Sequence, residues 1–285
     1  MGDLSFLSKI FRYVNANGDS LVFTYENGFV INKPNGIDSV TVNLSQAVGI
    51  NQVGATIQSS NVQPRPVTVS GRLVGEMSQV NKERLISVVR PDLEARLYAD
   101  DYYLVVKPTS TPSIEPRSDF AAFQFSVLAA YPYWQKDASS RVQLSSVSGG
   151  FKFPWNISRA YRFGTVTQTQ FIVISNNGQL PVPFTMTLLA KSECVNPRII
   201  NANTGKHLTI NKSMVAGERI VVEITHDRMY ATSSVDGDIR GALSIRSNLN
   251  RIDVGDNVLK PEADAGLDQL EIAIDFATEI VGVVL

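Results

Sequence analysis

Short runs of strand-forming residues, separated by turn residues, dominate the hydrophobic pattern of the chain. Residues 40–44 (VTVNL) and 67–74 (VTVSGRLV) alternate apolar and polar positions. Because successive side chains of a strand point to opposite faces, this alternation predicts half-buried strands. Residues 20–25 and 29–31 flank an Asn-Gly turn and favour a hairpin. The pattern therefore predicts a mainly β protein.

The segment between the two alternating runs, residues 49–66, has a different composition. It is polar and rich in Gln, Asn, Ser and Pro, and it is long for a connection inside a compact domain. We interpret it as either a functional arm or an extended hairpin. Because such an arm is costly to leave unsupported, we expect the N-terminal domain to carry the oligomer interface.

One helix is expected, over residues 78–90. Ser78 can cap it, and its apolar face comprises Leu85, Ile86, Val88 and Val89. The helix should end before Pro91, since the residue before a proline is pushed out of the helical region. Strands are expected to follow at residues 94–98, 102–107 and 120–129.

A change in composition marks the expected domain boundary. Residues 135–150 are polar, rich in Ser and end in Gly149-Gly150, which is typical of an exposed connection. We therefore expect an N-terminal domain over residues 1–134, a linker over 135–150 and a second domain over 151–276. Asn-Gly and Thr-Gly turns at short spacing predict a β-sandwich for the second domain, with strands at residues 171–175, 184–190, 198–201, 220–225, 229–232 and 270–276.

The last residues, 279–285 (EIVGVVL), are too apolar to hang free in water at roughly 25 cal/mol per Å² of apolar area. We hypothesise that residues 277–285 leave the sandwich. They would then pair with a strand of the N-terminal domain or with a neighbouring subunit, covering a bare sheet edge. The alternative is that they extend the last strand of the sandwich.

Composition and charge exclude several classes of protein. The 285 residues are 44% hydrophobic and 19% charged, which excludes a disordered chain and suits two domains. With 26 Lys plus Arg against 27 Asp plus Glu, there is no basic surplus for nucleic-acid binding. Neither a long apolar run for a membrane span nor a secretory signal is recognised. The single Cys194 cannot form an internal disulfide and suits a reducing cytosol.

The residue types that carry catalysis do not form a recognisable constellation. His226 lies beside Asp227, but neighbours on a strand point to opposite faces and cannot act as a catalytic pair. Cys194 would need a histidine against it to act as a nucleophile. We therefore expect a protein that is not an enzyme, with no catalytic, cofactor-binding or metal-binding residues and no cofactor.

Two other features have alternative interpretations. Asp236-Gly-Asp238 and the pair Asp253 and Asp256 could suggest calcium, but they lack the spacing of a calcium loop and fit tight turns better. Trp134 and Trp155 flank the linker together with Tyr131, Tyr133, Phe151 and Phe153. A sugar-stacking platform is one interpretation of these aromatics, and packing between the domains is the one we favour.

The first half of the chain resembles the N-terminal domain of the phage distal tail protein family. The resemblance rests on residues 120–134 (FAAFQFSVLAAYPYW), a phenylalanine-alternating strand closed by Pro-Tyr-Trp. It departs from the family at Tyr131, where an aspartate is usual. The preceding order also matches: a strand at residues 67–71, the helix at 78–90, and strands around Leu97-Tyr98 and Tyr102-Tyr103.

The second half resembles the C-terminal domain of the same family. The matching segments are residues 176–178, 181–184, 197–200, 203–205, 217–224, Leu249 and 254–258. In the last of these Asp253-Val254 replaces the proline region of the family motif. The order of these segments, more than any one of them, carries the resemblance.

The resemblance implies an N-terminal split β-barrel with one helix and a C-terminal galectin-like β-sandwich. It implies a structural protein of the virion tail tip, made in the host bacterial cytoplasm, that forms a homohexameric ring. Its partners would be the tail tube protein, the tail-associated hub or lysin protein and receptor-binding proteins, with no nucleic acid and no membrane. The alternatives are a carbohydrate-binding adhesion protein that contacts host wall polysaccharide and, ranked below it, a glycan-cleaving enzyme. A closed ring in solution would separate the structural function from both.

Overall fold

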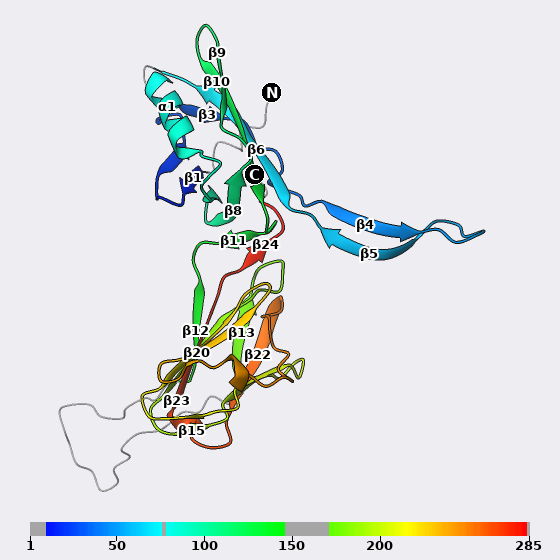
Figure 1. Ribbon diagram of the computed structural model, residues 1–285, viewed down its shortest axis with the longest axis vertical. Coiled ribbons are helices and arrows are strands. Elements are labelled where there is room, and N and C mark those ends of the chain that lie inside the picture. The colour runs from blue at the N-terminus through cyan, green and yellow to red at the C-terminus, as the bar shows by residue number, and fades with distance from the viewer. Residues whose placement is uncertain (1–9, 76–77, 146–170, 284–285) are drawn as a thin grey trace, which may run out of the picture. The chain divides into compact units, whose positions relative to one another are not determined.

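The computed structural model describes residues 10–75, 78–145 and 171–283 (Figure 1). The chain divides into two compact units. Unit 1 comprises Met1–Asp137 and Glu279–Leu285, and unit 2 comprises Ala138–Thr278. The chain therefore enters unit 2 after Asp137 and returns to unit 1 after Thr278.

Unit 1 is built on a ten-stranded antiparallel sheet. Its main path runs β2-β1-β7-β8-β10-β6-β3, while β9 pairs with β10, β11 with β8, and β24 with β11. The strands are β1 Phe11–Asn15, β2 Ser20–Phe23, β3 Phe29–Ile31, β6 Arg65–Leu73, β7 Ala95–Ala99, β8 Tyr102–Pro108, β9 Ser113–Pro116, β10 Ala121–Ala129, β11 Trp134–Lys136 and β24 Glu279–Ile280. This barrel-like sheet is the architecture expected for the first half.

Alternation along β10 builds the centre of the unit 1 core. Every second residue of this strand is buried, and Phe123 and Phe125 point inward beside Phe23 and Phe29. The rings of Phe23 and Phe29 meet edge to face with centroids 5.7 Å apart. Opposite Phe123 stands Gly71, where a Cβ would lie 2.3 Å from the backbone oxygen of Val30. Position 71 therefore needs a glycine, because the backbone of β3 approaches it closely.

Helix α1 (Ser78–Val88) covers this core with a face that differs from the expected one. Leu85, Val88 and Val89 are buried as expected, but Ile86 is 48% exposed. Residues 85, 88 and 89 share a face with position 81, whereas position 86 lies about a quarter-turn away. Asn81 completes this buried face and donates a 2.9 Å hydrogen bond to the Asn27 backbone oxygen. The Ser78 side chain lies outside the described residues.

Residues 49–66, interpreted as an arm or an extended hairpin, include the turn and second strand of a hairpin, whose first strand lies before residue 49, and the start of β6. Strands β4 (Val42–Ala47) and β5 (Thr56–Val62) pair with each other and form a separate two-stranded sheet. We call residues 42–62 the arm; it extends from the body of unit 1 (Figure 1). The expectation that residues 40–44 are half-buried is wrong, because β4 and β5 are exposed on both faces apart from the partly exposed Ala47. Their alternation matches a strand, but no layer covers either face.

Unit 2 is a β-sandwich. Its sheets are six-stranded, β12-β23-β14-β19-β20-β21, and four-stranded, β13-β22-β16-β17, with a ribbon of β15 and β18. The strands are β12 Ser140–Ser145, β13 Ile172–Asn176, β14 Thr185–Ala190, β15 Cys194–Val195, β16 Arg198–Asn201, β17 His207–Thr209, β18 Ser213–Met214, β19 Arg219–Ile224, β20 Met229–Ser233, β21 Gly237–Asp238, β22 Gly255–Glu262 and β23 Leu270–Phe276, with short 3-10 helices η2 Arg240–Ala242 and η3 Leu267–Gln269. Alternate residues such as Leu188 and Ile272 of one sheet and Ile199 and Leu259 of the other form its core. The mainly β fold, a barrel-like sheet followed by a sandwich, is thus the expected class.

The polar stretch expected to be a linker, residues 135–150, contains strands. Gln135 and Lys136 pair with Tyr103 and Tyr102 in unit 1. Strand β12 pairs with β23 at the edge of the sandwich, and Val142 packs against its core. A serine-rich edge strand needs only a few apolar positions, so composition alone does not distinguish it from a linker. Residues 146–150 lie outside the described part of the chain.

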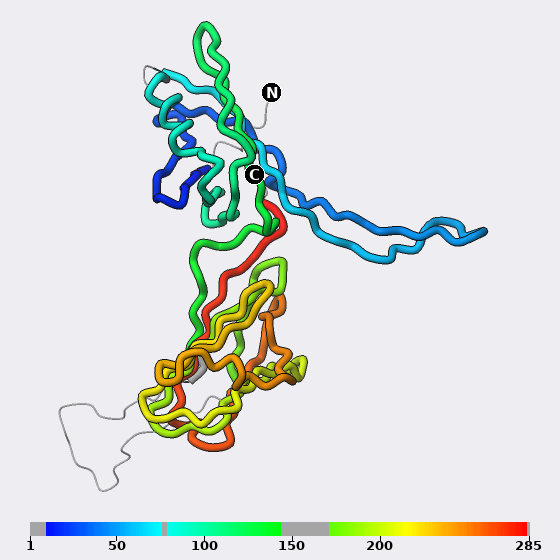
Figure 2. Tube along the Cα trace, viewed as in Figure 1, coloured from blue at the N-terminus to red at the C-terminus, as the bar shows by residue number. Residues whose placement is uncertain are grey.

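The end of the chain returns to unit 1, as hypothesised. Figure 2 shows the end of the chain, in red, returning to the green segment that contains β11. In β24, Ile280 pairs with Trp134 and Glu279 pairs with Gln135. Glu279 is 2% exposed; its carboxylate accepts a 2.5 Å hydrogen bond from the Tyr131 hydroxyl and a 3.4 Å bond from the Gln135 amide. The alternative, an extension of the last sandwich strand, is excluded because β23 ends at Phe276.

Candidate interaction surface

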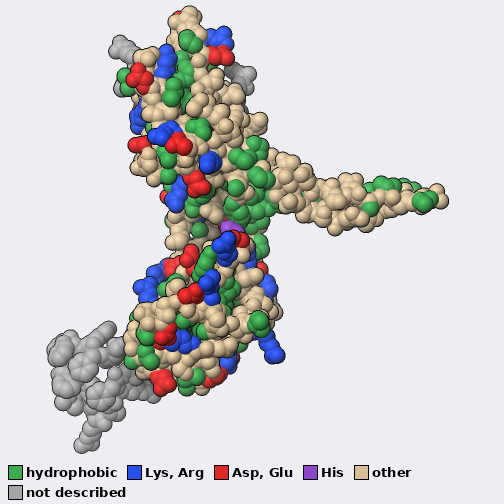
Figure 3. All heavy atoms as spheres, viewed as in Figure 1, with side chains coloured by type: hydrophobic (Ala, Val, Ile, Leu, Met, Phe, Trp, Pro, Cys, Tyr) green, Lys and Arg blue, Asp and Glu red, His purple; other side chains and the backbone are tan. Residues whose placement is uncertain are grey.

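The arm carries a surface of exposed apolar side chains without charge. At its tip Val48 is 71%, Ile50 98% and Val53 102% exposed. From Ser39 to Pro64 the sequence holds no Asp, Glu, Lys or Arg, although 19% of the chain is charged. Figure 3 shows the arm free of blue and red side chains and with apolar ones at its tip.

A hairpin of this kind is not expected to be stable when it stands alone in water. A two-stranded ribbon is marginal in water, and its outer edges present unpaired backbone groups that attract other strands. Exposed edges are usually protected by lysines, prolines or inward-pointing charges, and the arm strands have none of these between Val42 and Val62. The arm therefore has the chemistry of a segment that another protein surface covers.

Sequence reasoning identified this segment by its length and polarity but missed the apolar tip. The signal was present as the unbroken absence of charge from Ser39 to Pro64. Exposed segments of this length ordinarily contain charged residues, which favour solvation over association with other surfaces. Their absence, more than the excess of Gln and Asn, marks the arm as an interaction surface.

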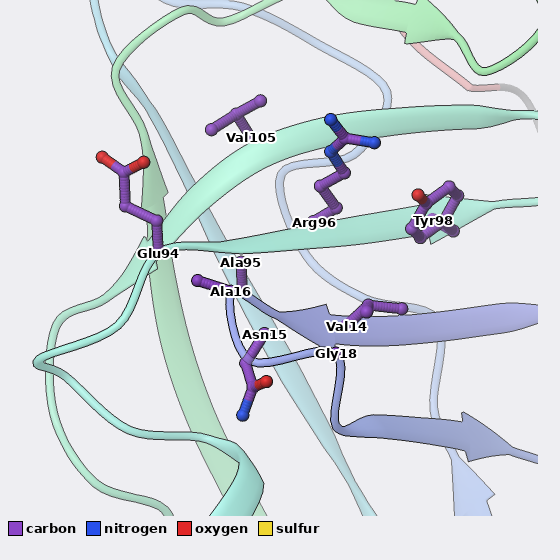
Figure 4. Close-up of a pocket in the computed structure, with 9 residues that line it drawn as sticks. All are labelled: Val14, Asn15, Ala16, Gly18, Glu94, Ala95, Arg96, Tyr98 and Val105. Atoms are coloured by element: carbon purple, nitrogen blue, oxygen red, sulfur yellow. The ribbon is translucent and has the colours of Figure 1, made fainter.

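A surface hollow in unit 1 of about 500 Å³ is the main alternative as a site (Figure 4). Its lining includes Val14, Asn15, Glu94, Arg96, Tyr98 and Val105. Figure 4 shows the polar side chains of Asn15, Glu94 and Arg96 pointing in different directions. A ligand or reaction site needs polar groups that converge on one point.

The polar residues of the hollow also have structural partners. The Asn15 side-chain oxygen accepts hydrogen bonds from the backbone of Asn17 and Asp19, at 3.1 and 2.9 Å, and so holds a turn. The Arg96 guanidinium lies 4.8 Å from the centre of the Tyr103 ring. This hollow therefore has a structural explanation and no catalytic arrangement.

His226 and Cys194 each lie in surroundings that explain them structurally. His226 lies 2.9 Å from Arg251, joined through its Nδ1, and the same arginine donates to the His226 backbone oxygen. Cys194 is completely buried in unit 2, where burial raises the pKa of its thiol to about 11. A thiol with a raised pKa and no exposed surface is a poor nucleophile.

The aspartates considered for calcium pair with cations or hydroxyls. Asp236 and Asp238 form ion pairs with Lys212 and Arg240, at 2.7 Å each. Asp253 lies 3.2 Å from Lys206 Nζ, and Asp256 accepts a 2.5 Å hydrogen bond from Ser175. Within the described ranges, no group of three or more His, Cys, Asp or Glu side chains is placed to hold a metal ion.

Trp134 is not an exposed sugar-stacking residue. Its ring is completely buried in the unit 1 core, so the sugar-platform interpretation fails for this residue, and so does packing between domains. Tyr131 and Tyr133 meet edge to face with centroids 5.4 Å apart. Phe151, Phe153 and Trp155 lie outside the described residues. No helix in the described part of the chain is long and apolar enough to cross a membrane.

Comparison with known proteins finds a family match within the second half of the chain. Residues 177–277 match the family described as siphovirus-type tail component, C-terminal domain. Among curated proteins no match is found. The resemblance inferred from the ordered segments of the second half is thereby confirmed.

One solved structure has a similar fold over most of the chain. The crystal structure of the SPP1 Dit (gp 19.1) protein, described as a paradigm of the hub adsorption apparatus in phages that infect Gram-positive bacteria, is 11% identical with a TM-score of 0.69. That likeness covers 94% of this chain and 98% of the Dit chain. A baseplate chain of phage P2, in its activated conformation with Ca, is 12% identical over 94% of this chain and 97% of its own, with a TM-score of 0.44.

Proposed function

We propose that this chain, whose residues 177–277 match the C-terminal domain of a siphovirus-type tail component, is a structural protein of a bacteriophage tail tip. The family match over residues 177–277, within unit 2, carries the proposal. The SPP1 Dit fold, which extends over both units, supports it for the first half. Its site of action would be the virion tail tip, after synthesis in the host cytoplasm.

The protein would assemble as a ring of identical subunits, a hexamer, through unit 1. The arm supports this because a ring places the same two surfaces of neighbouring subunits together. The exposed apolar side chains of Ile50 and Val53 at the tip would be buried against the next subunit. The strand edges of the arm would gain hydrogen-bond partners there. The tail tube protein would bind one side of the ring and the hub or lysin protein the other, with receptor-binding proteins attached farther out.

The role would be purely structural. The described residues show no converging nucleophile and base, and His226 and Cys194 have structural surroundings. Purified protein incubated with host cell wall should release no soluble sugar or peptide. Reproducible release that one carboxylate substitution abolishes would contradict this part of the proposal.

The location can be tested directly on phage particles. Gold-labelled antibodies raised against the purified chain should decorate virions at the distal end of the tail, at the junction of the tube and the adsorption apparatus. Labelling of capsids, or of the tube along its whole length, would contradict a tail-tip role. Antibody that has first been absorbed with the purified chain provides the control.

A further inference from the structure

The two ends of the arm meet the returning end of the chain at one place in unit 1. We call residues 279–283 the C-terminal strap. Asp38 lies just before the arm and Arg65 just after it, and both contact this strap. At the base of the arm, the Gln63 amide donates a 2.8 Å hydrogen bond to the Thr41 oxygen.

Arg65 joins the segment just before the arm, which we call the arm root, to the strap. Its side chain is buried, with the residue only 2% exposed. One guanidinium nitrogen donates to the backbone oxygens of Gly36 and Ile37, at 3.3 and 2.8 Å, and the other donates to the Val281 oxygen. A buried guanidinium that loses such partners is strongly destabilised, so these carbonyls are held in one arrangement.

Gly282 lets the strap approach the arm root closely. A Cβ at this position would lie 2.2 Å from the Asp38 backbone oxygen and 2.6 Å from its carbonyl carbon. The next residue, Val283, is 4% exposed and donates its amide to the Ile37 oxygen over 3.1 Å. Even one methyl group at position 282 would therefore separate the strap from the root.

We propose that Arg65 and the C-terminal strap are positioning elements for the arm. They hold the two segments that flank the arm, at Asp38 and at Arg65, so that the arm points at its partner in one direction. The arm strands pair with each other alone among the described strands, so the direction of the arm is set where it leaves the body. This proposal rests on the proposed ring, because a closed ring requires the same interface angle in every subunit. Loss of the strap contact frees the root and lowers ring yield, while both units stay folded.

The test compares full-length Gly282→Ala with Gly241→Ala, where a Cβ would meet nothing within 4 Å. Hydrogen–deuterium exchange is read at the Val283 amide and at the Gln63 amide of the arm base. Gly282→Ala should speed exchange at both by roughly tenfold or more and leave β22 unchanged, whereas Gly241→Ala should match the wild type. Wild-type exchange rates in Gly282→Ala would overturn the proposal. Faster exchange at the Gln63 amide with an undiminished ring yield would also overturn it.

A second pair of variants covers the case in which Gly282→Ala does not fold. Arg65→Met removes the three hydrogen bonds with little loss of bulk, and Arg65→Lys should recover part of the wild-type protection and ring yield. In the wild type itself, the Val283 and Gln63 amides should lose protection at the same low urea concentration, as one cooperative unit. Independent opening of the two amides would overturn the proposal. Absence of a ring in the wild type would refute the proposed function, whereas the exchange results test the strap alone.

Discussion

The indole nitrogen of Trp134 donates a 3.0 Å hydrogen bond to the backbone oxygen of Ile37, 97 positions earlier in the sequence. The same oxygen accepts from Arg65 at 2.8 Å and from the Val283 amide at 3.1 Å. Trp134 begins β11, the last strand of unit 1 before the chain enters unit 2. One carbonyl thus joins the segments where the chain leaves unit 1, where it returns and where the arm begins.

Replacing this indole tests how much that junction contributes to stability. Trp134→Phe keeps an aromatic ring but removes the donor, so the free energy of unfolding should fall by at least about 1 kcal/mol. Urea denaturation followed by circular dichroism measures the change. Tyr25→Phe, at a side chain that is 77% exposed, is the control and should have no effect. Equal stability of the Trp134 variant and the wild type would show that the bond contributes nothing.

Charges at the arm tip should block assembly without unfolding the protein. Ile50→Lys combined with Val53→Lys adds two charges to side chains that are 98% and 102% exposed in the single chain. Burying them on a neighbour would then be strongly unfavourable, so the ring should give way to monomers. Ile245→Lys is the matched control, since Ile245 is 101% exposed in unit 2. Size-exclusion chromatography with thermal melting distinguishes lost assembly from lost folding, and rings that persist in the double variant would rule out burial of the tip.

Glu218 should give unit 2 a pH-dependent stability. Burial alone raises the pKa of this carboxyl, but hydrogen bonds from Ser233, Val215 and Lys212 outweigh it and hold the pKa below its usual range. Because the folded pKa lies below the unfolded one, the stabilisation is complete above the unfolded pKa and is lost as pH falls through the folded value. Glu218→Gln should therefore cost about 2 kcal/mol at neutral pH, the scale of hydrogen bonds to a charged group.

That cost should shrink in acid, where the wild-type carboxyl is protonated and is therefore uncharged, like the glutamine that replaces it. Urea denaturation at pH 7 and at progressively lower pH measures the difference between the wild type and Glu218→Gln. Glu26→Gln, at an exposed turn residue, is the control and should change little at any pH. A difference that stays constant across the range would mean that ionisation of Glu218 is not what stabilises the site.

Cys194 should resist thiol reagents in the folded protein. Its side chain has no exposed surface, and burial raises its pKa to about 11, so little thiolate exists at pH 8. A maleimide added at that pH should leave the native chain unlabelled and label one site per chain in denaturant, as expected for a single cysteine. Rapid labelling of the native protein would place Cys194 at an accessible surface.

The sequence was most informative where a periodic pattern and its environment agreed. Alternation in β10 and β23 identified strands whose alternating apolar residues are buried. The apolar side chains at the end of the chain predicted a segment that leaves the sandwich, and β24 indeed pairs with β11 of unit 1. In these segments the residue pattern and the burial depend on the same local spacing.

It was least informative where distant segments decide the environment. Residues 40–44 alternate like a half-buried strand, yet no layer covers β4. The buried face of the helix includes Asn81 and not Ile86, and Asn81 is satisfied there by a hydrogen bond to the Asn27 carbonyl, which local spacing does not reveal. The position of Trp134 under Ile37 depends on a contact between remote residues, which composition does not encode. Such placements follow from tertiary packing, and local spacing alone does not determine them.

The molecular mass of the purified full-length chain in solution tests the central claim most directly. Multi-angle light scattering should report a closed ring, with a mass several times that of the 31.2 kDa chain and matching six copies. Electron micrographs of the same fraction should show particles with a central opening. A mass that stays at 31.2 kDa at all concentrations, including those that promote assembly, would contradict a ring-forming tail-tip protein.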